Sequence, residues 1–388
     1  MRINKGVFYF FLLFPFFKSD MITEVYKLQW LDRLYDVWKL IAIGIMTCLW
    51  IKNKKIDVKL IVLLIQILST VFSTIINGNI KNCVPYISIQ LSVVYIGILI
   101  CLVIANNDME YFLRAAYVLL ASYCICNLIS VIIFAPIGGM YHPDGMRVIT
   151  KNRYLLGSKN YQVLFIFPFI GLSSIYDIYC FKNIRRVTII LHILSIIPLV
   201  VTEAVTAIIG VTMYYIFYFL MSKSPRSARY LNGYIMILVN LVIFVFVIIL
   251  DGQRYFSSFF MTLFHKNLQS QRAYIWQKYI EAAFNKLYMG YGYVSYSERR
   301  VSVGVVHAHN QYLDIIYQSG LIGIGIFILL IGYSLKCVKG DKIKYIIICS
   351  IMVWLIMFQS EYYYSNPGFY IFVFLCFNWN ELEERWKE

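Results

Sequence analysis

Residues 84–104 read VPYISIQLSVVYIGILICLVI, a stretch without a single charged side chain. A helix needs about 20 apolar residues to cross the roughly 30 Å hydrocarbon core of a bilayer, so this stretch is predicted to span a membrane. Similar stretches recur along the whole chain, near 6–17, 37–50, 59–76, 112–134, 161–179, 187–201, 204–220, 233–250, 312–335, 343–358 and 368–379.

The composition supports the same fold class. Hydrophobic residues make up 60% of the chain and charged residues 14%, whereas soluble domains carry about 25% charged residues. We therefore expect an all-α fold, a polytopic integral membrane helical bundle with about 12 transmembrane helices. Residues 187–220 form one continuous apolar stretch that is too long for a single tilted helix, so we divide it around Val201–Glu203.

The chain is strongly basic. Lys and Arg number 35 against 20 Asp and Glu, which gives a formal net charge of +15. In a membrane protein such an excess is explained by cytoplasmic loops and anionic lipids better than by nucleic acid. We expect membrane lipids as partners and no nucleic acid.

The distribution of basic residues predicts the orientation. Lys and Arg make up roughly one residue in three in one set of loops and about one in eight in the other, so both termini should be cytoplasmic. We predict a multi-pass protein of the cytoplasmic (inner) membrane. It is divided into an N-terminal bundle of about nine spans (1–250), a long extracytoplasmic loop (251–311), and C-terminal spans with a cytoplasmic tail (312–388).

The long loop contains a helical pattern of its own. One apolar stripe is formed by Ile275, Trp276, Tyr279, Ile280, Ala283, Phe284 and Leu287. This spacing is typical of an amphipathic helix, with Ser270 as its N-cap and Gly290 as its stop. We expect the helix to lie on the outer membrane interface or to cover a cavity.

Polar residues stand where the long loop re-enters the membrane. On a helix, His309 would share a face with Tyr312, and Asn310 with Asp314. His309 could accept a proton from a hydroxyl, or it could be a polar residue seated at the headgroup level. Asp314 is roughly one turn into the apolar run, where ionisable groups usually serve a function; a structural pairing with Arg272 or with a helix N-terminus is the alternative.

Arg272 opens the amphipathic helix along its apolar face. An arginine in that position either reaches headgroup phosphates or points into a site that needs an anion clamp. The earlier outer loop contributes Arg147, Lys151, Arg153 and Lys159, followed by Asn160. This positive cluster could be solvated, but it fits a diphosphate or an acidic sugar.

No signature of a soluble enzyme competes with this interpretation. The chain has no GxxxxGKS phosphate loop, HExxH, CxxC pair or GxSxG elbow. His307-Ala308-His309 has no nearby third ligand, so it is weak evidence for a metal.

Four motifs in order resemble the O-antigen ligase and polymerase superfamily of bacterial membrane glycosyltransferases. They are Arg272-x-x-Ile275-Trp276, Gly290-Tyr291-Gly292, His309-Asn310-x-Tyr312-Leu313 and Gly320-Leu321-Ile322-Gly323. The resemblance implies that a sugar carried on undecaprenyl diphosphate is transferred to an acceptor hydroxyl at the outer face. It also implies that the enzyme needs no nucleotide sugar and neither a metal nor another cofactor. In the same way it implies that Arg272 clamps the diphosphate and that His309 acts as the base or orients the acceptor.

The chain departs from the family in one place. Many members carry a Ser-Arg pair in the span before the long loop's entry helix, where this chain has Thr202-Glu203-Ala204-Val205-Thr206-Ala207. We expect Arg147 or Arg153 to supply the missing cation. The candidate substrate-binding residues are Arg147, Arg153, Asn160, Asn310, Tyr312 and Glu203, and the candidate catalytic residues are His309, Arg272 and Asp314.

The leading hypothesis is a polymerase of lipid-linked oligosaccharide repeat units of O-antigen, capsule or exopolysaccharide. Its partners would be the undecaprenyl-diphosphate-linked donor and acceptor, with a flippase and chain-length regulators as further candidates. The nearest alternative is a ligase that moves finished glycan to a lipid or other acceptor. A flippase or other transporter is the alternative of another class, but a transporter should show paired repeats, and none is evident.

Overall fold

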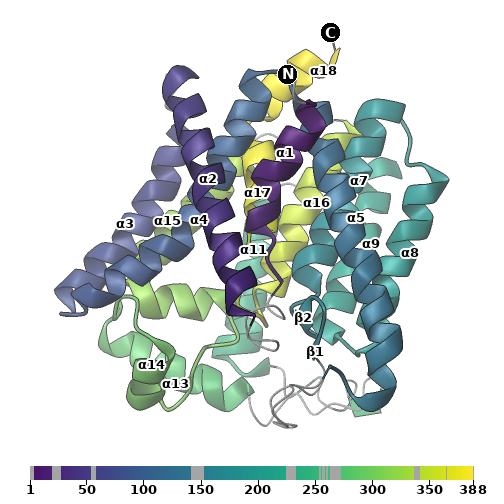
Figure 1. The fold of residues 1–388 in the computed structure, drawn as a ribbon. Helices are drawn as coiled ribbons and strands as arrows, with labels where there is room; N and C mark the ends of the chain where they lie inside the picture. Colours follow the sequence, from purple (N-terminus) through teal and green to yellow (C-terminus); the bar gives the residue numbers. More distant parts are fainter. Residues whose placement is uncertain are drawn as a thin grey trace.

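The computed structural model is a bundle of helices (Figure 1). It describes residues 4–19, 28–53, 58–140, 153–223, 233–252, 255, 258, 261–262, 272–335, 341–363 and 365–387. In its first half lie α1 (Lys5–Leu13), η1 (Phe14–Phe16), α2 (Gln29–Asn53), α3 (Val58–Ile76), η3 (Ile80–Asn82), α4 (Cys83–Ala105), α5 (Met109–Phe134), η4 (Ala135–Ile137), β1 (Arg153–Tyr154), β2 (Gly157–Ser158) and α7 (Val163–Phe181).

The second half is also helical. It comprises α8 (Arg186–Val201), α9 (Val205–Lys223), α11 (Gly233–Ile243), the π-helical turn η5 (Phe244–Ile249), α13 (Arg272–Asn285), α14 (Tyr296–Val303), α15 (Gln311–Ser334), α16 (Lys342–Met357), α17 (Pro367–Phe377) and α18 (Trp379–Lys387). Each span predicted from the sequence coincides with one of these helices. The all-α integral membrane class is confirmed.

Length separates the helices into two groups. Among the residues that the structure describes, seven helices are long and apolar enough to cross a membrane by themselves. Shorter apolar helices cover Lys5–Phe16, Arg186–Val201, Gly233–Ile249 and Pro367–Phe377. The predicted division of 187–220 is confirmed, because α8 ends at Val201 and Glu203 takes a left-handed conformation (φ 51°) in the turn before α9.

The core is built around α16 and α17. Every residue of Pro367–Cys376 is buried, and α17 packs against α4, α7, α15 and α16. The peripheral helices instead expose apolar side chains, such as Ile189 and Ile193 on α8 and Leu238 on α11. With lipid as the solvent, these outward faces are compatible with the hydrocarbon core.

The two ends of the bundle differ. The chain termini and α18 lie at one end, and α13, α14, β1 and β2 lie at the other, which we call the loop end (Figure 1). The short strands pair as an antiparallel hairpin in which Arg153 faces Ser158. Leu155 N donates to Ser130 Oγ and Leu156 N to Asn127 Oδ1, so the hairpin is tied to α5.

Candidate functional site

Helix α15 is interrupted at Gly320, and the interruption joins two of the family motifs. Gly320 has φ 63° and ψ −158°, a conformation essentially restricted to glycine. The amides of Leu321 and Ile322 donate to the carbonyls of Leu287 (2.8 Å) and Tyr288 (3.3 Å). The loop that contains Gly290-Tyr291-Gly292 therefore caps the helix break.

The same loop returns hydrogen bonds to the first part of α15. Tyr291 N donates to Tyr317 O and Gly292 N to Gln318 O, both at 2.8 Å. A Cβ on Gly290 would lie 2.5 Å from Tyr317 O, which explains why a glycine stands there. The sequence predicted the motifs but not their mutual contact, which holds 311–319 at the loop end.

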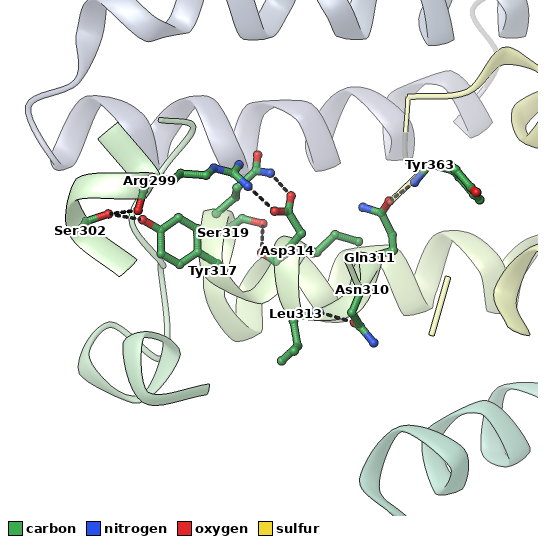
Figure 2. A network of polar contacts seen from close by, with 11 residues as sticks. Arg299, Ser302, Asn310, Gln311, Leu313, Asp314, Tyr317, Ser319 and Tyr363 are labelled. Carbon is green, nitrogen blue, oxygen red and sulfur yellow. Dashed lines mark hydrogen bonds and ion pairs between the residues drawn. The ribbon is translucent and has the colours of Figure 1, made fainter. Parts of the chain in front are cut away.

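A buried ion pair fixes α14 against this part of α15. Arg299 Nη1 donates to Asp314 Oδ1, and Gln318 Nε2 donates to Asp314 Oδ2 (Figure 2). The side chains of Arg299 and Asp314 are 2% and 0% exposed. Asp314, a candidate catalytic residue, thus has Arg299 as its partner, and not the Arg272 considered from the sequence.

Sequence reasoning missed Arg299, although a local signal precedes it. Ser295 and Glu298 form a capping box at the start of α14, a pattern that predicts a helix N-terminus. Burial alone would lower the pKa of Arg299, but the charge of Asp314 raises it above the ordinary value. Arg299 therefore keeps its charge, and the pair anchors α14 against α15.

A second ion pair joins distant segments at the loop end. Arg272, the first residue of α13, places Nη2 2.9 Å from Glu361 Oε1. Asn160 Nδ2 donates to the same oxygen at 2.8 Å, and Tyr363 Oη donates to Asn160 O at 2.7 Å. Two residues singled out from the sequence, Arg272 and Asn160, therefore meet on a carboxylate that the sequence analysis overlooked.

The Glu361 side chain is 7% exposed, whereas that of Arg272 is 28% exposed. Burial raises the pKa of Glu361, and the charge and hydrogen bond of Arg272 partly offset that rise. In the sequence, Glu361 lies between the apolar stretches 343–358 and 368–379. Ionisable residues at such positions usually serve a function, so this position could have identified Glu361 as a candidate site residue.

The loop that carries Glu361 is bound to the segment that follows His309. Asn310 Nδ2 donates to Gln359 O at 2.7 Å, and Gln311 N donates to Phe358 O at 2.9 Å. Tyr363 N donates to Gln311 Oε1 at 3.1 Å (Figure 2). These bonds explain how the re-entry motif and Glu361 come to share one end of the bundle.

His309 lies just outside α15. The helix begins at Gln311 with Asn310 as N-cap, whose Oδ1 accepts from Leu313 N at 2.8 Å. His309 itself has φ 47°, so the helical face that it was expected to share with Tyr312 does not exist. The imidazole of His309 lies beside that of His307, and their ring centroids are 3.8 Å apart.

The histidine pair is electrostatically linked to Arg272. Burial, and after it the charges of His307 and Arg272, lower the pKa of His309 to about 3. Burial likewise lowers the pKa of His307. Both imidazoles are therefore neutral at physiological pH. We call Arg272, Glu361, Asn160, His307 and His309 the Arg272 site.

Two buried hydrogen-bond donors belong to the segments that carry this site. Within the described part of the chain, Trp276 Nε1 and Gln311 Nε2 are buried without a hydrogen-bond partner. Trp276 is one helical turn beyond Arg272 on α13. Because a buried donor without a partner costs about 1–3 kcal/mol, such groups are candidates for contact with a polar ligand.

The remaining candidates are Tyr312, Arg153, Glu203 and Arg147. Tyr312 Oη donates to Leu355 O at 2.7 Å and its ring packs on Phe244. Arg153 begins β1, Glu203 is exposed in the α8–α9 turn, and Arg147 falls outside the described residues. No group of three potential metal ligands is found among the residues that the structure describes.

Comparison with known protein families gives a match for one region of the chain. Residues 190–328 match the family model described as O-antigen ligase. This part of the chain is therefore similar to the O-antigen ligase family. The match supports, over that part of the chain, the resemblance to the ligase and polymerase superfamily.

The matched region covers Arg272, Arg299, His309, Asp314 and Gly320, but it ends before Glu361 and begins after Asn160. The Arg272 site is thus completed by residues on both sides of the match. Neither the curated proteins nor the solved structures that were searched gave a match.

Proposed function

We propose that this enzyme polymerises undecaprenyl-diphosphate-linked oligosaccharide repeat units of a surface polysaccharide. The observation that carries the proposal is the pairing of Arg272 with Glu361 at the loop end, inside and beside the family match. A carboxylate held by a guanidinium is the nearest protein analogue of a bound phosphate oxygen. In this proposal the donor diphosphate takes the place of Glu361 on Arg272.

The reaction breaks the bond between the sugar's reducing-end carbon and the diphosphate oxygen. The acceptor hydroxyl oxygen forms the new bond to that carbon, and undecaprenyl diphosphate leaves with the electron pair. Arg272 stabilises the charge that develops on the leaving group, a contribution of roughly 3 kcal/mol for one well-placed donor.

Two side chains are candidates to accept the hydroxyl proton, His309 and Glu361. A base with a pKa of about 3 takes up a proton poorly, and binding of a diphosphate would offset Arg272 but not burial, the largest cause of the low value. Burial raises the pKa of Glu361, and loss of Arg272 to the diphosphate would raise it further. In this proposal Glu361 accepts the proton, and His309 orients the acceptor hydroxyl.

The loop end faces the extracytoplasmic side in this proposal, and both termini face the cytoplasm. The supporting observation is the excess of Lys and Arg in the loops of the terminal end, since cytoplasmic loops collect basic residues. Donor and acceptor are then lipid-linked units delivered by a flippase, with chain length set by separate regulators.

The family description favours a second function. A ligase would transfer finished glycan to a lipid or another acceptor by the same donor chemistry. Deletion of the gene separates the two, because loss of a polymerase leaves single repeat units on the acceptor whereas loss of a ligase leaves long chains on the carrier lipid. Units trapped inside the cell would contradict both functions.

Complementation of the deletion tests the site. Arg272→Ala and His309→Ala should abolish chain growth while the protein still accumulates in the membrane. Lys278→Ala is the matched control, since Lys278 is another cation of α13 whose side chain is 39% exposed and pairs with Glu281. Normal ladders from the first two variants would refute the assignment.

A further inference from the structure

The turn between β2 and α7 lies against the loop that carries Glu361. Asn160 Nδ2 donates to Glu361 Oε1 at 2.8 Å, and Tyr363 Oη donates to Asn160 O at 2.7 Å. The rings of Tyr161 and Tyr363 meet edge to face, with their centroids 6.2 Å apart. Lys159 is the residue between β2 and Asn160, so these contacts place its backbone near the carboxylate.

The backbone around Lys159 is held by a buried amide. Asn127 of α5 is 0% exposed. Its Oδ1 accepts from Leu156 N at 3.1 Å, and its Nδ2 donates to Gln162 Oε1 at 2.8 Å. The residues three positions before and three positions after Lys159 are thus tied to the same helix. A backbone that is already fixed reduces the entropy lost when a long side chain binds a ligand.

Two cations of the described residues act on Glu361 from different elements. Burial raises the pKa of Glu361, the charge and hydrogen bond of Arg272 lower it, and the charge of Lys159 lowers it further. Arg272 belongs to α13, and Lys159 belongs to the turn after β2. Both residues are partly exposed, so both are accessible to a ligand that approaches the carboxylate.

The turn between α8 and α9 adjoins both of these segments. Thr202 Oγ1 is 3.5 Å from Gln162 Nε2, and Thr206 Oγ1 is 3.4 Å from Ser360 Oγ, in the loop of the carboxylate. From Thr202 to Thr206 the chain reads TEAVT, without a basic side chain. Positive charge on this side of the carboxylate therefore comes from Lys159 and not from the α8–α9 turn.

We propose that Lys159 is the second cation of the donor site and binds one phosphate of the diphosphate while Arg272 binds the other. The proposal rests on the proposed function, and it replaces the role expected from the sequence for Arg147 or Arg153. Glu361 is the anion that both cations share in this structure. A diphosphate, with two adjacent phosphates, takes up both cations and leaves the carboxylate able to accept the hydroxyl proton.

Lys159 lies outside 190–328, the region of the family match, so the match assigns it no role. An ammonium group is a compact point charge with three donors, and it binds a phosphate without the planar geometry that a guanidinium imposes. Together Lys159 and Arg272 distinguish a diphosphate from a monophosphate, because only the diphosphate has a second phosphate to place on the lysine.

The test measures equilibrium binding of undecaprenyl diphosphate and of undecaprenyl phosphate to the full-length protein in detergent. Lys159→Gln should reduce the preference for the diphosphate by about tenfold, the effect of one hydrogen bond to a charged group. Lys81→Gln is the matched control and should leave the preference unchanged. Lys81 pairs with Glu298 of α14, also at the loop end, and its side chain is 80% exposed.

A cation placed from another helix separates the charge of Lys159 from its place in the hairpin. Thr206→Arg, added to Lys159→Gln, should restore the preference for the diphosphate, because Thr206 adjoins the loop of Glu361. Lys159→Arg keeps the charge and should retain the preference without any change to α9. If the lysine only supported the hairpin, its loss would weaken both ligands equally and Thr206→Arg would restore neither.

Three outcomes would overturn the role of Lys159 alone. They are an unchanged preference in Lys159→Gln, an equal loss of both affinities in that variant, and failure of both Thr206→Arg and Lys159→Arg to preserve the preference. A wild type that binds undecaprenyl phosphate as tightly as the diphosphate would instead overturn the donor chemistry of the proposed function. Because no acceptor is present, the result is the same for a polymerase and for a ligase.

Discussion

Arg272 and Glu361 lie 2.9 Å apart, although 89 residues separate them in the chain. The carboxylate is almost completely buried and also accepts a hydrogen bond from Asn160. This contact holds a partly exposed guanidinium in a fixed position near a neutral histidine pair.

The first prediction concerns the carboxylate. Glu361→Gln keeps the size of the side chain but removes its charge and its capacity to accept a proton. Transfer should fall by roughly 10²–10⁴-fold in kcat, the usual contribution of a general base. Donor binding should not weaken, because the diphosphate no longer competes with Glu361 for Arg272.

Steady-state kinetics with a purified lipid-linked donor checks this prediction. Asn160→Ala serves as the control, since it removes a hydrogen bond to Glu361 Oε1 and leaves the negative charge of Glu361 in place. A rise in KM with unchanged kcat in Glu361→Gln would mean that the carboxylate only positions Arg272.

The second prediction concerns the geometry of the cation. Arg272→Lys keeps the charge but loses the planar pair of donors that matches a phosphate. We expect kcat/KM to fall by about 10²-fold in Arg272→Lys, and at least as far in Arg272→Ala. Full activity of the lysine variant would show that charge alone suffices.

The third prediction concerns pH and His309. The pKa of His309 is about 3 in the folded protein against an ordinary 6.5, so between these values the unfolded chain binds the proton that the folded one does not. The stability contributed by the neutral imidazole is therefore complete above about pH 6.5 and is lost as the pH falls towards 3.

Thermal unfolding in detergent at several pH values measures this effect. The Tm of the wild type should decline between pH 6.5 and 5, and His309→Gln should decline less steeply because the glutamine does not titrate. Parallel curves for the two proteins would contradict the low pKa.

The fourth prediction concerns the buried pair of Arg299 and Asp314. Asp314→Asn leaves the guanidinium buried without a counter-charge and should destabilise the protein by about 3–5 kcal/mol. Replacing both residues, as in Arg299→Met with Asp314→Leu, should restore much of the loss. Membrane accumulation and Tm report the effect; a stable Asp314→Asn protein without activity would instead support the catalytic role considered from the sequence.

The fifth prediction concerns the break in α15. A Cβ on Gly320 would lie 2.2 Å from the carbonyl of Tyr288, and the backbone conformation is one that only glycine adopts readily. Gly320→Ala should cost about 1–3 kcal/mol in strain alone. Gly325→Ala, where a Cβ meets no atom within 4 Å, should be neutral or slightly stabilising, and a comparable loss at both positions would argue against a local cause.

The sequence by itself determined the fold class, the positions of the apolar helices and the resemblance to a family. A hydrocarbon slab imposes a length of about 20 apolar residues on any helix that crosses it, so each span can be recognised without knowledge of its neighbours. Local patterns of apolar residues also located the division between α8 and α9 at Val201–Glu203 and the helix that begins at Arg272.

Only the tertiary structure decided which of the polar residues meet. Hydrophobic periodicity describes one helix at a time and contains no information about partners far along the chain. Glu361 as the partner of Arg272, Arg299 as the partner of Asp314, and the capping of the Gly320 break by the Gly290-Tyr291-Gly292 loop all arise from contacts between segments. The division of the chain at 250 and 311 stays a prediction. Packing selects these partners because buried charges and freed backbone groups in an apolar surrounding must find a counterpart, and the fold determines which counterpart lies within reach.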